Sequence, residues 1–298
     1  MIDLSLRLLR ARRGARNIEA PDPERSIPYS SAPFISGDTF RGFAGAEIAG
    51  TEVRTYNGLD TRMLFASSET SVQRDFVRRA EMTANRFDAR TLIIHNGDLL
   101  PSKADLKSLG GIFERVFCVN LVNEGVNIFS LPIGLENANR RNNGRLSYYF
   151  EGLQAPRESS RPRLVLSSFH TSTNPVEREP VEALFARSRF GFDGHHWKRL
   201  EYRRVLADSC FVISPPGNGV DCHRTWEAIY MGAVPVVLRD RLAASLAEDM
   251  PILCVDSYEE ILDLSDDQLR AKYDALVKLT PQKAFSNYWA KQLFGQES

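Results

Sequence analysis

The sequence predicts an α/β protein whose second half is a parallel sheet with helices on both faces. Four continuous apolar runs are expected to be buried strands: residues 163–169, 210–214, 233–238 and 252–255. Stretches with helical character separate or follow them: residues 175–187, 197–208, 222–231, 242–249 and 258–278. Alternating strands and helices of this kind indicate a doubly wound, Rossmann-like domain, which binds ligands at the carboxyl ends of its strands.

The first half of the chain gives a weaker signal for a second α/β domain. Short apolar runs predict strands at residues 63–66, 91–95, 116–119 and 128–131, and a helix is expected at 76–85. Residues 1–60 show little periodicity, and the polar segment 144–162 is the best candidate linker. We therefore expect three parts: an N-terminal α/β domain at 1–155, a C-terminal Rossmann-like domain at 156–280, and a final helix within 281–298.

Composition and charge exclude several classes of protein. Lys plus Arg (38) equals Asp plus Glu (38), whereas a dedicated nucleic-acid binder usually has a basic excess. No apolar run reaches the roughly 18 residues that span a bilayer, and arginines interrupt the N-terminus where a secretion signal needs an apolar core. The four cysteines lack a CxxC pair or zinc-ligand spacing. A cytoplasmic, reducing location is therefore expected.

The first 18 residues are strongly basic, with arginines at positions 7, 10, 12, 13 and 16. Such a segment can lie on an anionic membrane surface or on an acidic glycan carrier. The same composition also fits a solvated helix or a frayed chain end. The sequence therefore leaves two alternatives: a segment that contacts an anionic partner, such as the inner face of the membrane, or a segment that is only solvated.

The segment 210–238 carries the main functional pattern, and it reads CFVISPPGNGVDCHRTWEAIYMGAVPVVL. A strand runs into a Pro/Gly loop, and a helix follows for which Asp221 is the predicted N-cap. The free N–H groups of a helix start suit a diphosphate, and Arg224 in the first turn can add a bidentate contact. Glu227 shares that helix face and suits the two hydroxyls of a ribose. The spacing alone also fits an ordinary turn with a surface Arg–Glu ion pair.

The run SPPGNGVDCHRTWEAIYMGAVPVV, residues 214–237, closely resembles the donor-binding motif of exostosin-like and related GT-B glycosyltransferases. A strand, a Gly-containing loop, an Arg, a Glu-Ala pair and a G-x-x-P-V return follow in the same order. SGDTFRGFA (36–44), IIHNGD (93–98) and LPIGLEN (131–137) resemble segments of small bacterial glycosyltransferases that share the motif. The resemblance implies two Rossmann-like domains facing a central cleft, with residues 281–294 crossing back to the first domain. The chain is short for this fold, so a trimmed N-terminal domain is expected.

The resemblance also assigns roles to the donor-binding residues. It implies that Arg224 meets the diphosphate of a nucleotide-sugar and that Glu227 meets the ribose. The remaining donor-binding candidates are Ser214, Gly217, Asn218, Gly219, Asp221 and His223. The nucleotide-sugar is the substrate, and no further cofactor is expected. The acceptor would be a glycan or a lipid-linked glycan in surface polysaccharide assembly.

The catalytic base must come from elsewhere in the chain. Asp98 and His95 stand at the end of the predicted strand 91–95, where α/β proteins gather ligands, and Glu69 follows the strand 63–66. Each has a structural alternative, since Asn96-Gly97-Asp98 is also an ordinary turn and His95 can simply be hydrogen-bonded at a strand end. Further candidates for the cleft are His170, Lys198 and Arg199.

No metal site is expected from the sequence. Asp266-Asp267 falls in a polar helical region rather than in a loop, and the pair His195-His196 lacks a third ligand at suitable spacing. A metal-independent transferase is therefore the leading hypothesis. The alternatives are a sugar-processing α/β enzyme, such as an epimerase or a phosphorylase-like protein, and a nucleotide-sugar-binding protein without transferase activity.

Overall fold

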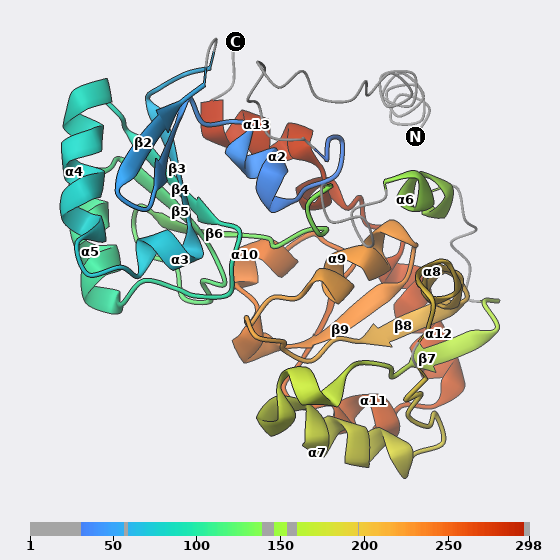
Figure 1. Ribbon diagram of the computed structural model, residues 1–298. Coiled ribbons are helices and arrows are strands. Elements are labelled where there is room, and N and C mark those ends of the chain that lie inside the picture. Colours follow the sequence, from blue (N-terminus) through green and yellow to red (C-terminus); the bar gives the residue numbers. More distant parts are fainter. Residues whose placement is uncertain (1–30, 57–58, 139–145, 154–159, 196, 295–298) are drawn as a thin grey trace.

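The computed structural model describes residues 31–56, 59–138, 146–153, 160–195 and 197–294, and it contains two β-sheets with helices packed around them (Figure 1). The first sheet has six strands in the order β2-β1-β3-β4-β5-β6 and the second has four in the order β10-β9-β8-β7. The prediction of an α/β fold is confirmed. The strands are β1 (Ala46–Ala49), β2 (Glu52–Thr55), β3 (Met63–Ser67), β4 (Thr91–His95), β5 (Arg115–Val119), β6 (Ile128–Leu131), β7 (Arg163–Leu166), β8 (Ser209–Ile213), β9 (Val234–Leu238) and β10 (Leu253–Val255).

The first sheet is mixed. β1 and β2 form an antiparallel hairpin at one edge, and β1, β3, β4, β5 and β6 are parallel to one another. The helices α4 (Phe76–Phe87) and α5 (Lys103–Ile112) cover one face, and the short helix α3 (Ser68–Ser71) follows β3. The helices α2 (Gly37–Arg41) and α13 (Ser286–Phe294) lie against the other face. Both faces of the parallel part are therefore buried, which explains its continuous apolar strands.

The second sheet is entirely parallel. Its alternate residues enter two different apolar clusters, because successive side chains of a strand point to opposite faces. One face packs on α7 (Pro175–Ala186), α11 (Glu259–Asp263) and α12 (Asp266–Leu276), and the other on α8 (Arg199–Ala207), α9 (His223–Tyr230) and α10 (Ala244–Ala247). The predicted two-sided cover is confirmed. The strand order follows the chain order without reversal among the described strands, so the doubly wound topology stays a prediction.

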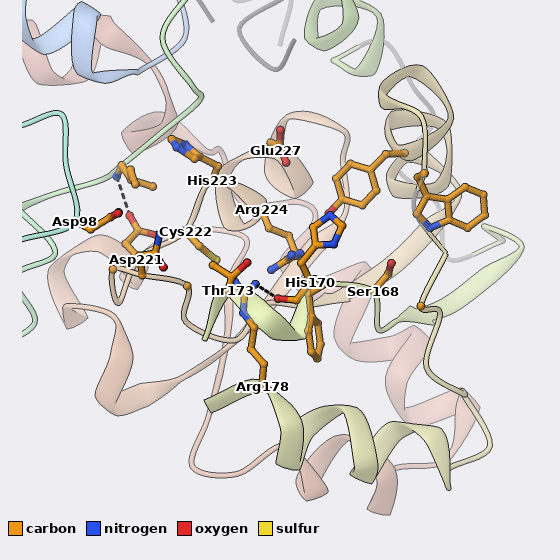
Figure 2. Close-up of a pocket in the computed structure, with 18 of the residues that line it drawn as sticks. Asp98, Ser168, His170, Thr173, Arg178, Asp221, Cys222, His223, Arg224 and Glu227 are labelled. Atoms are coloured by element: carbon orange, nitrogen blue, oxygen red, sulfur yellow. Dashed lines mark hydrogen bonds between the residues drawn. The ribbon is translucent and has the colours of Figure 1, made fainter. Parts of the chain in front are cut away.

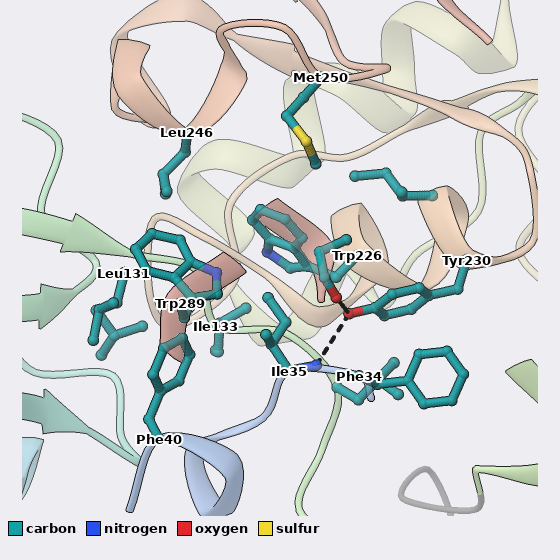
Figure 3. Packing of buried hydrophobic residues seen from close by; sticks show 14 of the residues in the cluster. Phe34, Ile35, Phe40, Leu131, Ile133, Trp226, Tyr230, Leu246, Met250 and Trp289 are labelled. Atoms are coloured by element: carbon teal, nitrogen blue, oxygen red, sulfur yellow. Dashed lines mark hydrogen bonds between the residues drawn. The ribbon is translucent and has the colours of Figure 1, made fainter. Parts of the chain in front are cut away.

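The two sheets share one apolar core (Figure 3). Tyr230 of α9 contacts Phe34 ring to ring at 4.8 Å. Its hydroxyl accepts the Ile35 N–H at 3.3 Å and donates to the Ala284 carbonyl at 2.5 Å. Residues from the start, the middle and the end of the described chain thus meet in a single cluster, which fixes the two halves against each other.

The helix α13 packs on the first half of the chain. The Trp289 ring meets the Phe40 ring edge-on at 5.7 Å. Arg115 of β5 donates to the carbonyls of Gln292 at 2.7 Å and Leu293 at 2.8 Å, which would otherwise be unsatisfied at the helix end. Of the helices in the described ranges, none combines the length and the apolar character that a bilayer span requires.

The segment 144–162, predicted as a linker, contains the helix α6 (Ser147–Gly152). Tyr149 of α6 is fully buried, and its ring lies 6.0 Å from Phe34 and 5.8 Å from Tyr230. The linker prediction is therefore wrong for residues 146–153, because apolar packing outweighs the polar composition around them. Residues 139–145 and 154–159 lie outside the described ranges, and so does the basic segment 1–18 with its predicted membrane contact.

Candidate functional site

A pocket of about 520 Å³ lies where the carboxyl ends of strands from both sheets converge. Asp98 follows β4, Ile133 follows β6, the segment 168–170 follows β7, and the segment 217–223 follows β8. Figure 2 shows Asp98 and Asp221 on one side, Ser168 on the opposite side, and Arg224 between them. Ligand sites of parallel α/β proteins gather at such strand ends.

Nine of the predicted residues line this pocket: Asp98, His170, Gly217, Asn218, Gly219, Asp221, His223, Arg224 and Glu227. Ser214 lies beneath it, buried, with its hydroxyl 2.9 Å from Thr225 Oγ1 and 3.1 Å from Cys222 Sγ. Ser214 therefore ties the end of β8 to the start of α9 and is not positioned to touch a ligand. Ser214 thus differs from the other predicted donor-binding residues, which line the pocket.

Two other candidates lie outside the pocket lining. Glu69 is exposed on α3, and its carboxylate packs against Gly97, where an added Cβ would lie 2.2 Å from Oε1. Lys198 is exposed immediately before α8, where its N–H donates to Glu201. Neither side chain is placed to act in the pocket. The side chain of Arg199 and the whole of His196 lie outside the described part of the chain.

The loop between β8 and α9 is held rigidly from below by Arg178 of α7. This buried side chain donates to the carbonyls of Pro216 at 2.7 Å and His170 at 2.8 Å. Asn174 adds a 2.7 Å bond from Nδ2 to the Gly217 carbonyl. With its carbonyls occupied in this way, the loop is preorganised before any ligand binds.

The same loop rests on the first sheet through Asn120, which follows β5 in a left-handed conformation (φ 62°). Asn120 Nδ2 lies 3.3 Å from the carbonyls of Gly97 and Asp98, and Oδ1 accepts the Asp221 N–H at 3.2 Å. A Cβ on Gly219 would lie 2.5 Å from Asn120 Oδ1. Glycine is therefore needed here for the close approach of the two halves, in addition to any contact with a ligand.

Asp221 is not the N-cap of α9. Cys222 occupies that position with extended backbone, and no side chain caps the helix there. The Asp221 carboxylate is buried and accepts the Ile133 N–H at 2.8 Å and the Trp226 Nε1–H at 2.8 Å. It joins the two halves instead, because a buried carboxylate gains more from two such donors than from an exposed cap. Burial raises the pKa of Asp221 to about 6.

His95 is a structural residue rather than a base at the pocket. Its ring is buried and stacks on Phe40 at 5.1 Å. Nε2 lies 3.0 Å from the Pro132 carbonyl, and Nδ1 accepts the Asn96 N–H at 2.7 Å, so both ring nitrogens are in use. Burial lowers the pKa of His95 to about 4, which keeps the ring neutral. These contacts favour the structural alternative for His95.

His95 and Asp221 are expected to affect stability in opposite directions on acidification. The pKa of His95 falls from 6.5 to about 4 on folding, so the unfolded chain protonates first and stability is lost as pH falls through this window. The pKa of Asp221 rises from 3.8 to about 6, so the folded protein protonates first and gains stability as pH falls from 6 to 4. In the wild type the two effects offset each other.

Asp221→Asn should therefore lose stability more steeply than the wild type between pH 6 and pH 4, by about 1 kcal/mol per pH unit. The measurement is urea unfolding of both proteins at several pH values in this range. Parallel stability curves for the variant and the wild type would contradict the prediction.

Arg224 presents an enclosed positive charge to the pocket. Its Nε and Nη1 atoms are buried and have no hydrogen-bond partner among the described residues. Its guanidinium carbon lies 5.6 Å from the centre of the Phe169 ring, and that of Arg178 lies 5.7 Å from the same ring. Burial and the nearby charge of Arg224 lower the pKa of Arg178 to about 10. Two enclosed cations without a carboxylate between them are the arrangement that a bound anion compensates.

Glu227 belongs to a buried network that the sequence did not predict. Oε1 accepts the Tyr149 hydroxyl at 2.7 Å and Arg203 Nη2 at 3.1 Å, and Nη2 also lies 2.5 Å from the Tyr149 oxygen. Burial opposes the charge of Arg203, but the Glu227 carboxylate, Tyr149 and Tyr202 together outweigh burial and raise the pKa of that guanidinium. The ion partner of Glu227 is therefore Arg203, and the alternative of a surface Arg224–Glu227 pair is wrong. Within the described ranges, Oε2 of Glu227 has no hydrogen-bond partner.

A scan against protein-family models found no match for this sequence, and no curated protein matches it.

Several residues that line the pocket were not predicted from the sequence, because no local pattern marks them: Phe169, Arg178, Trp197, Tyr202 and Arg203. They lie on α7, on α8 or beside these helices, and the fold brings them to the loop. Only the aromatic and arginine content of 197–204, WKRLEYRR, could have drawn attention to that segment.

Proposed function

We propose that this protein is a glycosyltransferase that moves a sugar from a nucleotide-sugar donor to a glycan or lipid-linked glycan acceptor. The observation that carries the proposal is the enclosed guanidinium of Arg224 beside Arg178, in a pocket at the carboxyl ends of β7 and β8. Its Nε and Nη1 atoms have no hydrogen-bond partner among the described residues. A diphosphate has the negative charge that complements both cations and the acceptor oxygens that Arg224 lacks. The resemblance of residues 214–237 to the donor-binding motif of GT-B enzymes supports the same reading.

The donor is proposed to lie along the pocket with its diphosphate at Arg224 and the loop 217–219. The start of α9 adds the partial positive charge of a helix N-terminus. The ribose hydroxyls would donate to Oε2 of Glu227, which Tyr149 and Arg203 hold in place through Oε1. The transferred sugar would then face Asp98 and His223, on the side formed by both halves of the chain. We accordingly propose a GT-B arrangement of two Rossmann-like domains.

In this mechanism the bond between the anomeric carbon and the diphosphate oxygen breaks while an acceptor oxygen bonds to that carbon. Negative charge grows on the departing diphosphate, and Arg224 stabilises it where water is excluded. Asp98 is proposed as the base that takes the proton from the acceptor hydroxyl, because it is the predicted carboxylate of the first half that reaches the pocket. The positive groups needed by the leaving diphosphate come from side chains and the helix, as in a metal-independent transferase.

Thermal-shift measurements with UDP, GDP and CMP, followed by transfer assays, test the proposal. We expect a nucleoside diphosphate to raise the melting temperature, because it binds only the folded pocket. Asp98→Asn should lower the transfer rate constant by about 10²–10⁴-fold and leave nucleotide affinity unchanged. If no nucleotide stabilises the protein, the transferase proposal is wrong. If nucleotide-sugar binds but is never transferred, the protein is a nucleotide-sugar-binding protein.

A further inference from the structure

Trp197 brings an unsatisfied hydrogen-bond donor to the pocket. Its Nε1 atom is buried and has no hydrogen-bond partner within the described part of the chain, and the residue lines the pocket. The other two tryptophans are satisfied, since Trp226 Nε1 donates to Asp221 at 2.8 Å and Trp289 Nε1 to the Lys283 carbonyl at 2.8 Å. Buried indole N–H groups normally find a partner. The exception therefore indicates an acceptor that a ligand supplies.

A chain of hydrogen bonds places Trp197 at the β7 end of the pocket. Ser167 follows β7, and its carbonyl accepts the Asp193 N–H at 2.8 Å. Asp193 Oδ1 accepts the His195 N–H at 3.1 Å, and the His195 carbonyl accepts the Trp197 N–H at 3.0 Å. Ser168, the next residue after Ser167, lies on the far side of Arg224 from Asp98 (Figure 2). Trp197 is thus tethered to the end of the pocket opposite the proposed sugar site.

Aromatic rings line the pocket both beside Trp197 and beside Arg224, whose guanidinium carbon lies 5.6 Å from the centre of the Phe169 ring. The His195 ring meets the Trp197 ring edge-on at 4.6 Å, and Phe169 and Tyr202 line the same pocket. Flat π-faces and a single free donor suit a nucleobase, which stacks on aromatic rings and offers acceptors at its edge. The opposite end offers the carboxylate of Asp98 instead, since the carboxylate of Asp221 is bound to Ile133 and Trp226.

We propose that the end of the pocket beside Trp197 binds the nucleobase of the donor and that Trp197 Nε1–H donates to a carbonyl oxygen of that base. This inference rests on the proposed function and makes it more specific. It selects bases that carry a carbonyl, such as uracil or guanine, over adenine, which has none. The nucleobase, the diphosphate and the sugar then occupy the pocket in order from Trp197, through Arg224, to Asp98.

Titration calorimetry of the wild type and of Trp197→Phe tests the inference, with UDP, GDP, ADP and inorganic pyrophosphate as ligands. The variant keeps an aromatic ring and loses only the indole donor. The wild type should bind UDP or GDP more tightly than ADP. The variant should lose about tenfold in affinity for the preferred nucleotide and keep its affinity for pyrophosphate, since one buried hydrogen bond is lost.

The outcomes separate this inference from the proposed function. Equal affinity of variant and wild type for every nucleotide, or tightest binding of ADP by the wild type, overturns the role of Trp197 and leaves nucleotide binding intact. An equal loss for UDP and pyrophosphate also overturns it, because Trp197 would then only support the pocket walls. A wild type that binds none of the nucleotides overturns the transferase proposal and this inference together.

Discussion

Arg224→Met is expected to weaken nucleotide binding on the order of 100-fold while leaving the ligand-free protein equally stable or more stable. Arg224 contributes little hydrogen bonding to the fold, since its Nε and Nη1 atoms have no partner among the described residues and its side-chain hydrogen bond is to Tyr202. Its charge also lies close enough to Arg178 to lower the pKa of that group. Replacing this enclosed charge with an apolar side chain of similar length removes the repulsion. Loss of a charged contact to a diphosphate should weaken binding by about 3 kcal/mol, on the order of 100-fold.

Two measurements check this opposite response of stability and binding. Urea unfolding gives the stability of the ligand-free variant, and calorimetry with UDP gives its affinity. Alkylation with iodoacetamide adds a local readout, because Cys222 lines the pocket and bound nucleotide should slow its modification. Cys254 of β10 is half-buried away from the pocket and serves as the internal control.

The matched control variant is Arg239→Met. Arg239 is exposed and pairs with Asp256 at the surface, so its replacement should change neither property by more than about 0.5 kcal/mol. An Arg224→Met protein that is clearly less stable but binds UDP normally would show that the guanidinium serves the fold and not a ligand.

Strand limits were predicted best where apolar residues follow one another along the chain, whereas β1 was missed although most of its residues are buried. β4 and β6 were predicted with their observed limits because both are continuous apolar runs. β2 was missed because its residues Glu52–Thr55 are mostly exposed and polar, so edge pairing rather than hydrophobic burial forms it. α6 was missed because the segment around it is polar and only three aromatic residues mark the helix. Tertiary contacts, which the local sequence does not display, bury Tyr149.

Apart from Asp98 and His170, which follow predicted strands, the lining residues that the sequence predicted all come from one local segment. Arg224 and Glu227 share a helix face at a spacing that the sequence displays, and both line the pocket. Arg178 and Arg203 reach the same place from two other helices, and no local pattern encodes that convergence. Asp221 has a side chain that favours the N-cap position, but it joins the two halves of the chain instead. Residue propensity alone therefore predicted the wrong role. The residues that hold the loop between β8 and α9 are therefore set by long-range packing.

Glu227→Ala is expected to lower the free energy of unfolding by about 3–5 kcal/mol, the cost of leaving a buried charge without its partner. The side chain of Arg203 is 3% exposed and would lose its carboxylate, and Tyr149 would lose the acceptor of its hydroxyl. Arg203→Met should be destabilising in the same way. The double variant Glu227→Ala/Arg203→Met should be less destabilised than the sum of the two single variants, because it leaves no unpaired charge.

The proposed contact between Glu227 and the ribose is tested by a variant that keeps the hydrogen bonds to Tyr149 and Arg203 and only weakens residue 227 as an acceptor. Glu227→Gln retains an oxygen for Tyr149 and Arg203, so it should be more stable than Glu227→Ala when both are unfolded in urea. It should nevertheless bind UDP more weakly, by about 1–3 kcal/mol, and bind inorganic pyrophosphate as the wild type does. Equal weakening for both ligands would place Glu227 at the phosphates or in the framework alone. A selective loss for UDP would instead mean that one buried carboxylate both neutralises Arg203 through Oε1 and reads the ribose through Oε2, with the network fixing its orientation before the donor arrives.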